Sequence, residues 1–320
     1  IFVQRQNLLA ELPEELAQAL ATSDPATLDV LLARHISEQN DNASRLLKTL
    51  YLVALDTPLL HQSLLRLLAS LPLRPGLFKG VRYLFKMAEF RLDATMFALL
   101  AWRFDTTREF YAAEWDGVWV NDVGYIKPSQ ELLRDDSRLA YSRKTRHYLR
   151  RRSWRALRRL GAREDTRYVD MACAILLQYS DADLMPEKQN GLGIYASDAH
   201  FFAWNAILRS HNPCYQRHRQ RALWIQVDDE TDEIRGEDFP QLWDQRPDAL
   251  LGLLHHTESD AVCSFALRAL KENLTFCHAL TDNQLLQLLA RPFPTLVDFV
   301  LSLLSVSYTH LRAHETSAHL

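Results

Sequence analysis

Residues 24–36, Asp-Pro-Ala-Thr-Leu-Asp-Val-Leu-Leu-Ala-Arg-His-Ile, predict a helix both by how they begin and by how they repeat. An aspartate followed by a proline is typical of an N-cap and the first helical residue, because proline needs no backbone partner there. Leu28, Leu31, Leu32 and Ile36 then recur at the spacing that places side chains on one helix face. The stretch is therefore expected to be an amphipathic helix.

The same pattern of a cap followed by an apolar stripe recurs from one end of the chain to the other. Only 9 of 320 residues are glycine, which is few for a sheet-rich chain with many tight turns. We therefore predict an all-α protein. Because paired helices bury their apolar faces by stacking on neighbours, the expected architecture is an irregular α-solenoid of helical hairpins with loop insertions. The helices are expected at 7–21, 24–36, 43–55, 57–71, 76–91, 93–104, 143–160, 165–179, 247–256, 259–273, 281–290 and 294–304.

Two kinds of segment interrupt the helices. Val118-Trp-Val120 and Tyr125-Ile126 flank Asn121–Gly124 and predict a short β-hairpin, whereas 182–196 and 226–240 are rich in Gly, Asp and Glu and predict loops. The resulting division is 1–104 (N-terminal hairpins), 105–136 (insertion with the β-hairpin), 137–225 (hairpins with an Arg-rich helix), 226–240 (acidic loop), 241–304 (C-terminal hairpins) and 305–320 (tail).

Both ends of the chain are expected to be artificial. The sequence starts at Ile1 within an amphipathic stretch, so the natural N-terminus is expected upstream. Residues 306–316, Val-Ser-Tyr-Thr-His-Leu-Arg-Ala-His-Glu-Thr, match the translation of a transposon adapter used in sequencing libraries. We therefore treat 305–320 as an adapter-derived tail and leave its histidines, His310, His314 and His319, out of every site.

Composition restricts the compartment and the class of partner. No apolar run reaches the roughly 18 to 20 residues of a membrane span, so no membrane partner is expected. The four cysteines form no CxxC pair, which indicates a reducing compartment and a cytoplasmic protein. The net charge of −3 argues against a dedicated nucleic-acid binder, although a local basic patch can still bind one.

The strongest candidate for function is the Arg-rich segment 138–163, which has eleven basic residues and no acidic one. At 100° per residue, Tyr148, Leu149, Ala156, Leu157 and Leu160 share a packing arc. A cationic ridge is expected opposite, where arginines suit phosphate or carboxylate and a tryptophan can stack on a base. The predicted partner-binding residues are Arg143, Lys144, His147, Arg150, Arg151, Trp154, Arg155 and Arg158.

Three interpretations of this ridge stay open. It can be covered within the chain, since residues 181–260 hold fifteen acidic and seven basic residues and Asp228–Glu233 is strongly acidic. Arg152 and Arg159, at the edge of the packing arc, are expected to form buried ion pairs. Alternatively the ridge binds phosphates of a nucleic acid, or it binds an acidic protein.

Three motifs resemble a known family: Phe85-Lys-Met-Ala-Glu-Phe-Arg-Leu-Asp93, Tyr148-Leu-Arg-Arg-Arg-Ser-Trp-Arg-Ala-Leu-Arg-Arg-Leu160 and Leu242-Trp-Asp-Gln-Arg-Pro-Asp-Ala-Leu250. They are similar to bacterial HEAT-like helical-repeat proteins of the group associated with Trp-Gly-Arg (WGR) domains and molybdate metabolism regulators. The resemblance covers roughly 75–304 and implies HEAT-like hairpins, but no catalytic residue. No Trp-Gly-Arg motif occurs in the chain.

Other groups of polar residues are interpreted as structural. His211, Cys214 and His218 lack a zinc spacing and are expected in a loop before a basic helix. The acidic run from Asp228 lacks the glycine that an EF-hand needs. Asp198, His200 and Asn205 are expected near a helix start beside the core residues Phe201, Phe202 and Trp204, and His255-His256 at a helix C-terminus.

The sequence thus predicts a non-catalytic helical-repeat scaffold or interaction module without cofactor or metal. A protein is the expected partner of the Arg-rich face. A nucleic-acid backbone is the first alternative. The second is a non-catalytic fragment of a larger enzyme or regulator.

Overall fold

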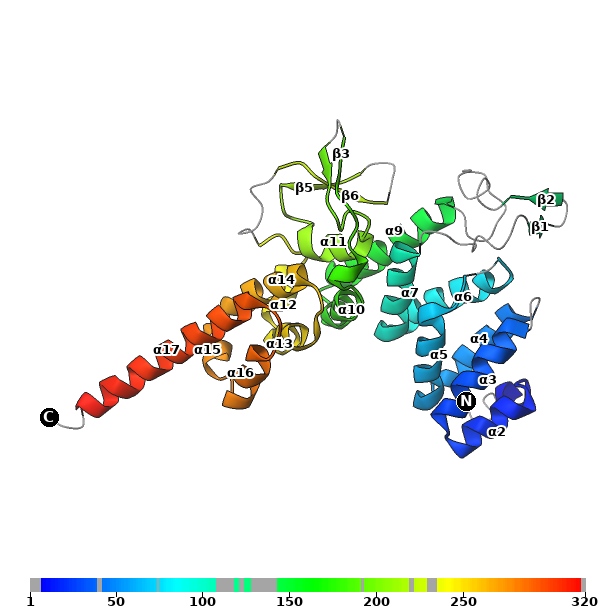
Figure 1. Cartoon of the computed structure of the whole chain (residues 1–320), viewed down its shortest axis with the longest axis horizontal. Coiled ribbons are helices and arrows are strands. Elements are labelled where there is room, and N and C mark those ends of the chain that lie inside the picture. The colour runs from blue at the N-terminus through cyan, green and yellow to red at the C-terminus, as the bar shows by residue number, and fades with distance from the viewer. Residues whose placement is uncertain are drawn as a thin grey trace. The chain divides into compact units, whose positions relative to one another are not determined.

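The computed structural model describes residues 7–38, 42–73, 75–107, 118–120, 124–127, 143–190, 193–218, 222–228 and 235–317. These residues are mostly helical and include a small antiparallel sheet, which is consistent with the predicted all-α class (Figure 1). The chain divides into two compact units. Unit 1 comprises 1–156, 201–203 and 219–222, and unit 2 comprises 157–200, 204–218 and 223–320.

Unit 1 is built from helices that pack on neighbours one or two positions along the chain. α3 contacts α2, α4 and α5, while α6 contacts α4 and α7. Its core includes Phe85, whose ring stacks on Phe97 at 4.8 Å and meets Phe104 edge-on at 5.1 Å. The helices are α2 (Glu14–Thr22), α3 (Pro25–Glu38), α4 (Ala43–Ala54), α5 (Pro58–Ser70), α6 (Pro75–Arg91), α7 (Ala94–Thr106) and the first part of α9 (Arg143–Gly161).

Some helix starts in unit 1 show the predicted capping, and one predicted helix is broken. The Asp24 carboxylate accepts hydrogen bonds from the backbone of Ala26 (3.1 Å) and Thr27, as predicted. The single helix predicted at 7–21 is wrong, because the chain breaks at Pro13 and α2 begins after it. Proline has no N–H and clashes with the preceding turn, so it starts a helix more readily than it continues one. The Pro13 carbonyl accordingly accepts the first bonds of α2, from Leu16 and Ala17.

The predicted β-hairpin is confirmed within unit 1. β1 (Val118–Val120) pairs antiparallel with β2 (Gly124–Ile126), with Val118 opposite Ile126 and Val120 opposite Gly124. Gly124 has a φ of 91°, a conformation that glycine adopts without the cost of a side chain.

Unit 2 combines helices with the sheet. Its helical core contains Trp243, which meets Tyr168 at 6.1 Å and Phe265 at 5.1 Å, both edge-on. α13 occupies the predicted residues, and α12 and α15 are short helices that were not predicted. The helices are the last part of α9, α10 (Arg167–Leu176), the 3-10 turn η1 (Asp181–Asp183), α11 (Phe202–Arg209), which begins in unit 1, α12 (Pro240–Asp244), α13 (Pro247–His256), α14 (Asp260–Lys271), α15 (Leu274–His278), α16 (Asp282–Leu289) and α17 (Pro294–Ser317).

The four-stranded sheet of unit 2 corrects the sequence prediction. Its order is β3 (Lys188–Asn190), β4 (Gly193–Tyr195), β6 (Trp224–Gln226) and β5 (Tyr215–Arg217), all antiparallel. The loop predicted at 182–196 therefore contains β3 and β4, and the loop predicted at His211–His218 contains β5. Residues 219–221 of the basic helix predicted after that loop lie outside the described residues. Strands of three residues are too short to show a period of two, and β4 and β6 pair across a long sequence separation. Of the predicted acidic loop, 229–234 lies outside the described residues.

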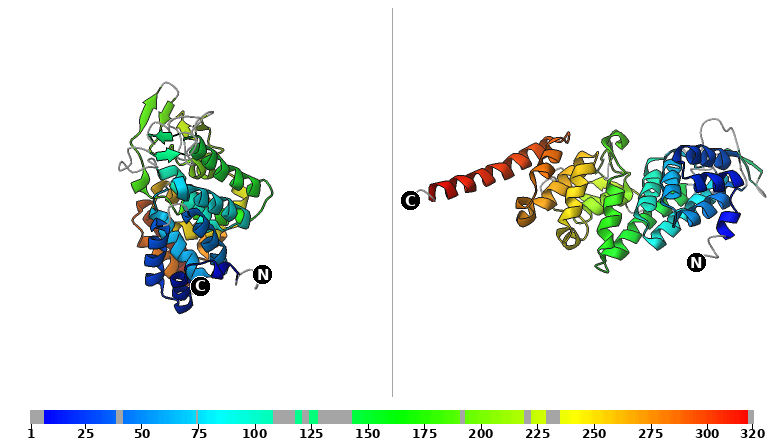
Figure 2. Two further views of the ribbon diagram at one scale, coloured as in Figure 1. Left: turned by 90° about the vertical axis from the view of Figure 1, so that its right-hand side faces the viewer. Right: turned by 90° about the horizontal axis from the view of Figure 1, so that it is seen from below.

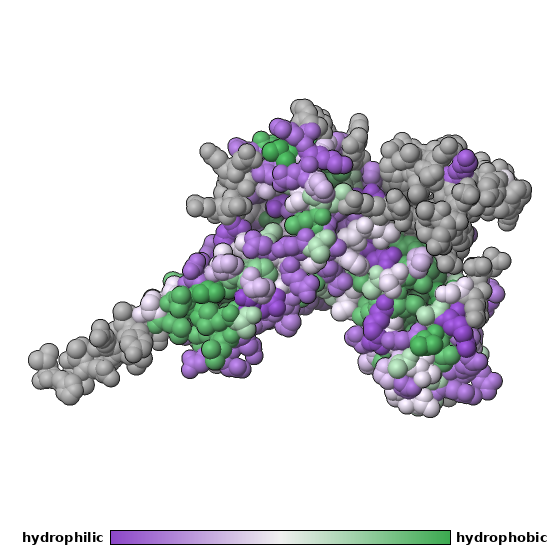
Figure 3. Space-filling model, in the orientation of Figure 1, coloured by the Kyte–Doolittle hydropathy of each residue, from purple (hydrophilic) through white to green (hydrophobic). Residues whose placement is uncertain are grey.

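The last helix, α17, continues past the predicted end at 304, so the backbone of 305–317 is helical (Figure 2). Beside it, the exposed side chains of Leu274, Leu286 and Leu301 contribute to a hydrophobic patch over α15–α17 (Figure 3). Among the described residues, no helix combines the length and the apolar character that a membrane crossing requires.

Candidate interaction surface of the Arg-rich helix

Helix α9 forms where it was predicted, but its buried side is rotated from the expected one. Leu149, Ala156 and Leu157 are buried, as predicted. Tyr148, assigned to the same arc, is 40% exposed, and Arg150, assigned to the ridge, is only 4% exposed. The packed face therefore includes an arginine and excludes a tyrosine.

Arg150 is buried because several oxygen atoms of unit 1 surround its guanidinium. Its Nε lies 2.7 Å from the Asp105 carboxylate and 3.1 Å from the Phe104 carbonyl. The other nitrogens donate to the carbonyls of Asp105 (2.7 Å) and Ala222 (3.3 Å). The second Asp105 oxygen accepts the backbone N–H of Phe202 at 2.8 Å. Arg150 is thus an internal ion-pair partner, which corrects its assignment to the binding ridge.

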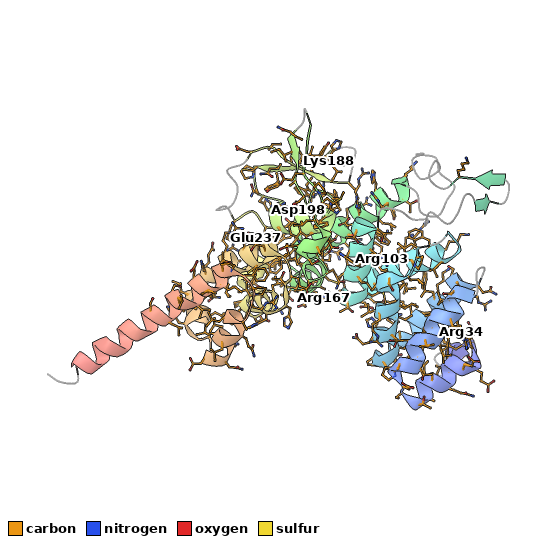
Figure 4. All side chains as sticks on the ribbon, viewed as in Figure 1. Arg34, Arg103, Arg167, Lys188, Asp198 and Glu237 are labelled. Atoms are coloured by element: carbon orange, nitrogen blue, oxygen red, sulfur yellow. The ribbon has the colours of Figure 1, made fainter. Side chains whose placement is uncertain are left out.

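Two other arginines also donate to backbone carbonyls of unit 1. Arg103, labelled in Figure 4, is buried on α7 and donates to the carbonyls of Leu68 (3.2 Å) and Leu71 (2.9 Å) at the end of α5. These carbonyls have no partner within their own helix, so the guanidinium supplies one. Arg146 of α9 similarly donates to the Thr107 carbonyl at 3.3 Å.

Trp154, predicted as the stacking residue of the ridge, is half-buried. Its ring meets Phe202 edge-on, with 6.4 Å between the ring centres. The indole therefore contributes to packing within unit 1, and the exposed aromatic ring on α9 is Tyr148.

Arg152 forms the ion pair that was predicted for it, and the same pair connects α9 to α6. Its Nε lies 2.5 Å from the carboxylate of Glu89, which is buried, and its Nη1 donates to the Tyr148 hydroxyl at 2.9 Å. Arg159, for which a buried pair was also expected, is exposed. Arg152 therefore neutralises the one acidic residue of α6 and fixes the hydroxyl of Tyr148.

The remaining ridge residues differ in their surroundings. Lys144 and Arg155 are exposed in unit 1, while His147 and Arg151 are half-buried. The Arg143 backbone begins α9, and its side chain lies outside the described part. Arg158 is exposed and belongs to unit 2.

Arg158 acts on a carboxylate of its own unit. Burial raises the pKa of Asp238, and the positive charges of His211 and Arg158 partly oppose that rise. His211 also lies 3.2 Å from the Asp238 carboxylate. The C-terminal end of α9 therefore has an acidic neighbour, Asp238, within the chain. Such a neighbour is what the interpretation of an internally covered ridge predicts.

Helix α6 contributes further cations and an aromatic ring to the region beside α9, and these residues were not predicted. Lys79, Arg82, Lys86 and Phe90 recur at spacings of three and four, which places them along one side of the helix. Phe90 is 81% exposed. Of the three cations, Lys79 is exposed and Arg82 and Lys86 are half-buried. Cations at this spacing, followed by a phenylalanine on the same side, were the sequence signal that could have identified this face.

The charges of α6 and α9 meet at Tyr148. Partial burial raises the pKa of the Tyr148 hydroxyl, but the hydrogen bond from Arg152 and the charges of Arg152, Lys86 and Arg155 outweigh it, so the net pKa is lowered. The Arg155 guanidinium lies 5.7 Å from the centre of the Tyr148 ring. These contacts place cations of both helices around one exposed aromatic ring.

We call this region the basic-aromatic surface. Among the described residues, no ion pair joins a carboxylate to Lys79, Arg82, Lys86, Lys144 or Arg155, and Glu89, the acidic residue of α6, pairs with Arg152. The surface is defined by Lys79, Arg82, Lys86 and Phe90 of α6 and by Lys144, Tyr148 and Arg155 of α9.

The other polar groups singled out in the sequence have structural partners. The Asp198 carboxylate, labelled in Figure 4, accepts from Arg209 at 2.8 Å, and Asn205 donates to the Asp198 carbonyl at 2.8 Å. His256 ends α13 and lies 2.8 Å from the Gly252 carbonyl. In the parts of the chain that the structure describes, no three His, Cys, Asp or Glu side chains are grouped to hold a metal.

Comparison with known proteins gives no counterpart, since no family model, no curated protein and no solved structure matches this chain.

Proposed function

We propose that this chain is a non-catalytic helical binding protein that holds an anionic partner on the basic-aromatic surface of unit 1. One observation carries the proposal: two adjacent helices present five cations that form no ion pair with a described carboxylate. Cations on neighbouring helices that no described carboxylate neutralises repel one another, and an anion relieves that repulsion. The partner therefore supplies the charge that unit 1 lacks at this face.

Local charge supports this role although the whole chain is acidic. α6 contains four basic residues and one acidic residue, and α9 from 143 to 156 contains no acidic residue. Screening limits the reach of exposed charges to about 10 Å at 0.1 M salt, so a partner responds mainly to the helices it touches. The net charge of −3 is consequently a poor guide to what binds here.

The architecture that suits this role is an α-solenoid of HEAT-like hairpins, as in the bacterial proteins that the three motifs resemble. The packing of α3 on α4 and α5, and of α4 on α5 and α6, supports this assignment. The four free cysteines support a place in the cytoplasm.

A salt titration tests the proposal. Binding of heparin, poly-L-glutamate and a short DNA duplex is measured at about 50 to 300 mM salt, with the full chain and with a variant in which Lys79, Lys86, Lys144 and Arg155 are changed to glutamine. For the duplex, each phosphate contact contributes about 0.9 to the slope of log affinity against log salt, so the variant is expected to lose roughly 3 to 4 in slope.

A matched control changes two cations elsewhere in unit 1, Arg34 and Arg66, which pair with Glu15 and Asp29. This control is expected to bind as the unmodified chain does. Equal binding by the four-residue variant and the control would refute the proposed surface, and so would the absence of binding to all three polyanions in a folded sample.

A further inference from the structure

We infer that the anionic partner is a single-stranded nucleic acid, whose phosphates contact the cations and whose bases stack on Tyr148 and Phe90. The inference rests on the proposed function and specifies the partner's class. It is carried by the exposed aromatic rings, which a purely electrostatic surface does not need. Single strands are bound by this combination of a cationic path and aromatic side chains.

Phe90 is placed where a base can reach it. Its side chain is 81% exposed, and it follows Lys86 by one helical turn on the same side of α6. From Lys79 to Phe90 the helix rises about 16 Å at 1.5 Å per residue, a length that suits a strand of a few nucleotides. A phenyl ring at the end of a row of cations offers a flat surface to a base whose phosphate lies on the row.

Tyr148 is held ready for stacking by a chain of contacts. Glu89 fixes Arg152, and Arg152 fixes the Tyr148 hydroxyl through the 2.9 Å hydrogen bond. A ring that is already oriented loses less conformational entropy when it binds than a free one. Glu89 and Arg152 are therefore positioning residues for the ring, while Lys86 and Arg155 supply charge beside it.

The aromatic rings favour a single strand over the two other polyanions. In a duplex the bases are stacked inside and cannot reach a flat helix face, and RNA is read mainly where its bases are unpaired. An acidic protein offers carboxylates but no exposed bases, so it gains from the cations alone. Only an unpaired strand uses both components of the basic-aromatic surface.

Fluorescence anisotropy with labelled (dT)15 and (U)15, a 15-base-pair duplex and poly-L-glutamate as competitor tests the inference on the full chain. Both single strands are expected to bind more tightly than the duplex, and comparing them shows which sugar is preferred. Because stacking contributes about 1 to 3 kcal/mol per base, Tyr148→Ala and Phe90→Ala are each expected to weaken single-strand binding roughly 5- to 150-fold without changing the salt slope.

Three controls separate stacking from folding. Tyr148→Phe keeps the ring and removes only the hydroxyl that Arg152 holds, so it is expected to weaken binding by less than Tyr148→Ala does. Val30→Ala removes an exposed apolar side chain of α3, elsewhere in unit 1, and is expected to have no effect. Circular dichroism shows that each variant retains its helices.

The outcomes distinguish this inference from the proposed function. If duplex or poly-L-glutamate binds as tightly as (dT)15 and (U)15 and Tyr148→Ala has no effect, the single-strand inference is overturned while the anion-binding function stands. If the effect of Tyr148→Ala is matched by Tyr148→Phe, the hydroxyl acts and stacking is refuted. If no polyanion binds at about 50 mM salt, both proposals fail.

Discussion

Replacing Arg150 by methionine tests whether this arginine belongs to the core, as the structure shows, or to the binding ridge, as the sequence predicted. The change leaves the buried Asp105 carboxylate without its ion pair and removes donors from the carbonyls of Phe104, Asp105 and Ala222. Breaking a buried ion pair from one side costs about 3 to 5 kcal/mol, because the remaining charge stays buried without compensation. We therefore expect Arg150→Met to destabilise unit 1 by about that amount.

Urea unfolding followed by circular dichroism measures this effect. With a slope of about 1 to 3 kcal/mol per molar urea, a loss of 3 to 5 kcal/mol lowers the midpoint of the unit 1 transition by more than about 1 M. Arg155→Met, one and a half turns further along α9, is the matched control because Arg155 is exposed. Its change in stability is expected to stay within about 0.5 kcal/mol. Similar midpoints for the two variants would refute the assignment of Arg150 to the core.

Three further predictions concern single side chains of both units. Burial raises the pKa of Asp93, but hydrogen bonds and the charge of a neighbouring histidine lower it overall. The stabilising effect of Asp93 is therefore complete above its ordinary pKa of 3.8 and is lost as pH falls through the lowered value. Asp93→Asn should flatten the fall of Tm below about pH 4, and parallel curves of Tm against pH for the two proteins would contradict this. A Cβ on Gly161 would lie 2.2 Å from the Phe239 ring, so Gly161→Ala should lower the free energy of unfolding in urea by about 1 to 3 kcal/mol. Gly252 has open space around it, so Gly252→Ala should stabilise α13 by about 0.5 to 1 kcal/mol. Equal effects of the two substitutions would be inconsistent with this packing. Thr281→Ala removes the capping box of α16 and should lower thermal stability by about 1 kcal/mol, and an unchanged melting curve would contradict a role for the cap.

Local signals account for the parts of the fold that could be predicted. Pro58, Pro247 and Pro294 each begin a helix where the sequence placed one, because proline at the first helical position acts within one turn. The sheet of unit 2 has no comparable signal. Its β4 and β6 pair at Ile194 and Gln226, and this pairing depends on contacts between distant residues instead of on a pattern within either strand.

The sequence identified the helix that carries much of the candidate surface, but not which side of that helix is exposed. The basic run located α9, and the spacing of its apolar residues located Leu149, Ala156 and Leu157 in the core. Hydropathy alone then assigned Tyr148 to the packed face of α9 and Arg150 to its exposed face. The oxygen atoms that reverse this assignment belong to residues 45 to 72 positions away from Arg150, so no local pattern contains them.

The reversal at Arg150 also explains why Tyr148 is exposed. Residues two apart on an α-helix point about 200° away from each other, so the rotation that places Arg150 against Asp105 turns Tyr148 outward. Arg152, a further two positions along, then lies on the same side as Tyr148 and reaches both its hydroxyl and Glu89. The buried ion pair thereby sets the rotation of α9, and this rotation presents the aromatic ring and its neighbouring cations to a partner. Stability and binding at this helix therefore depend on the same three residues, Tyr148, Arg150 and Arg152. A substitution at Arg150 that altered the rotation of α9 would weaken binding without removing any charge from the surface.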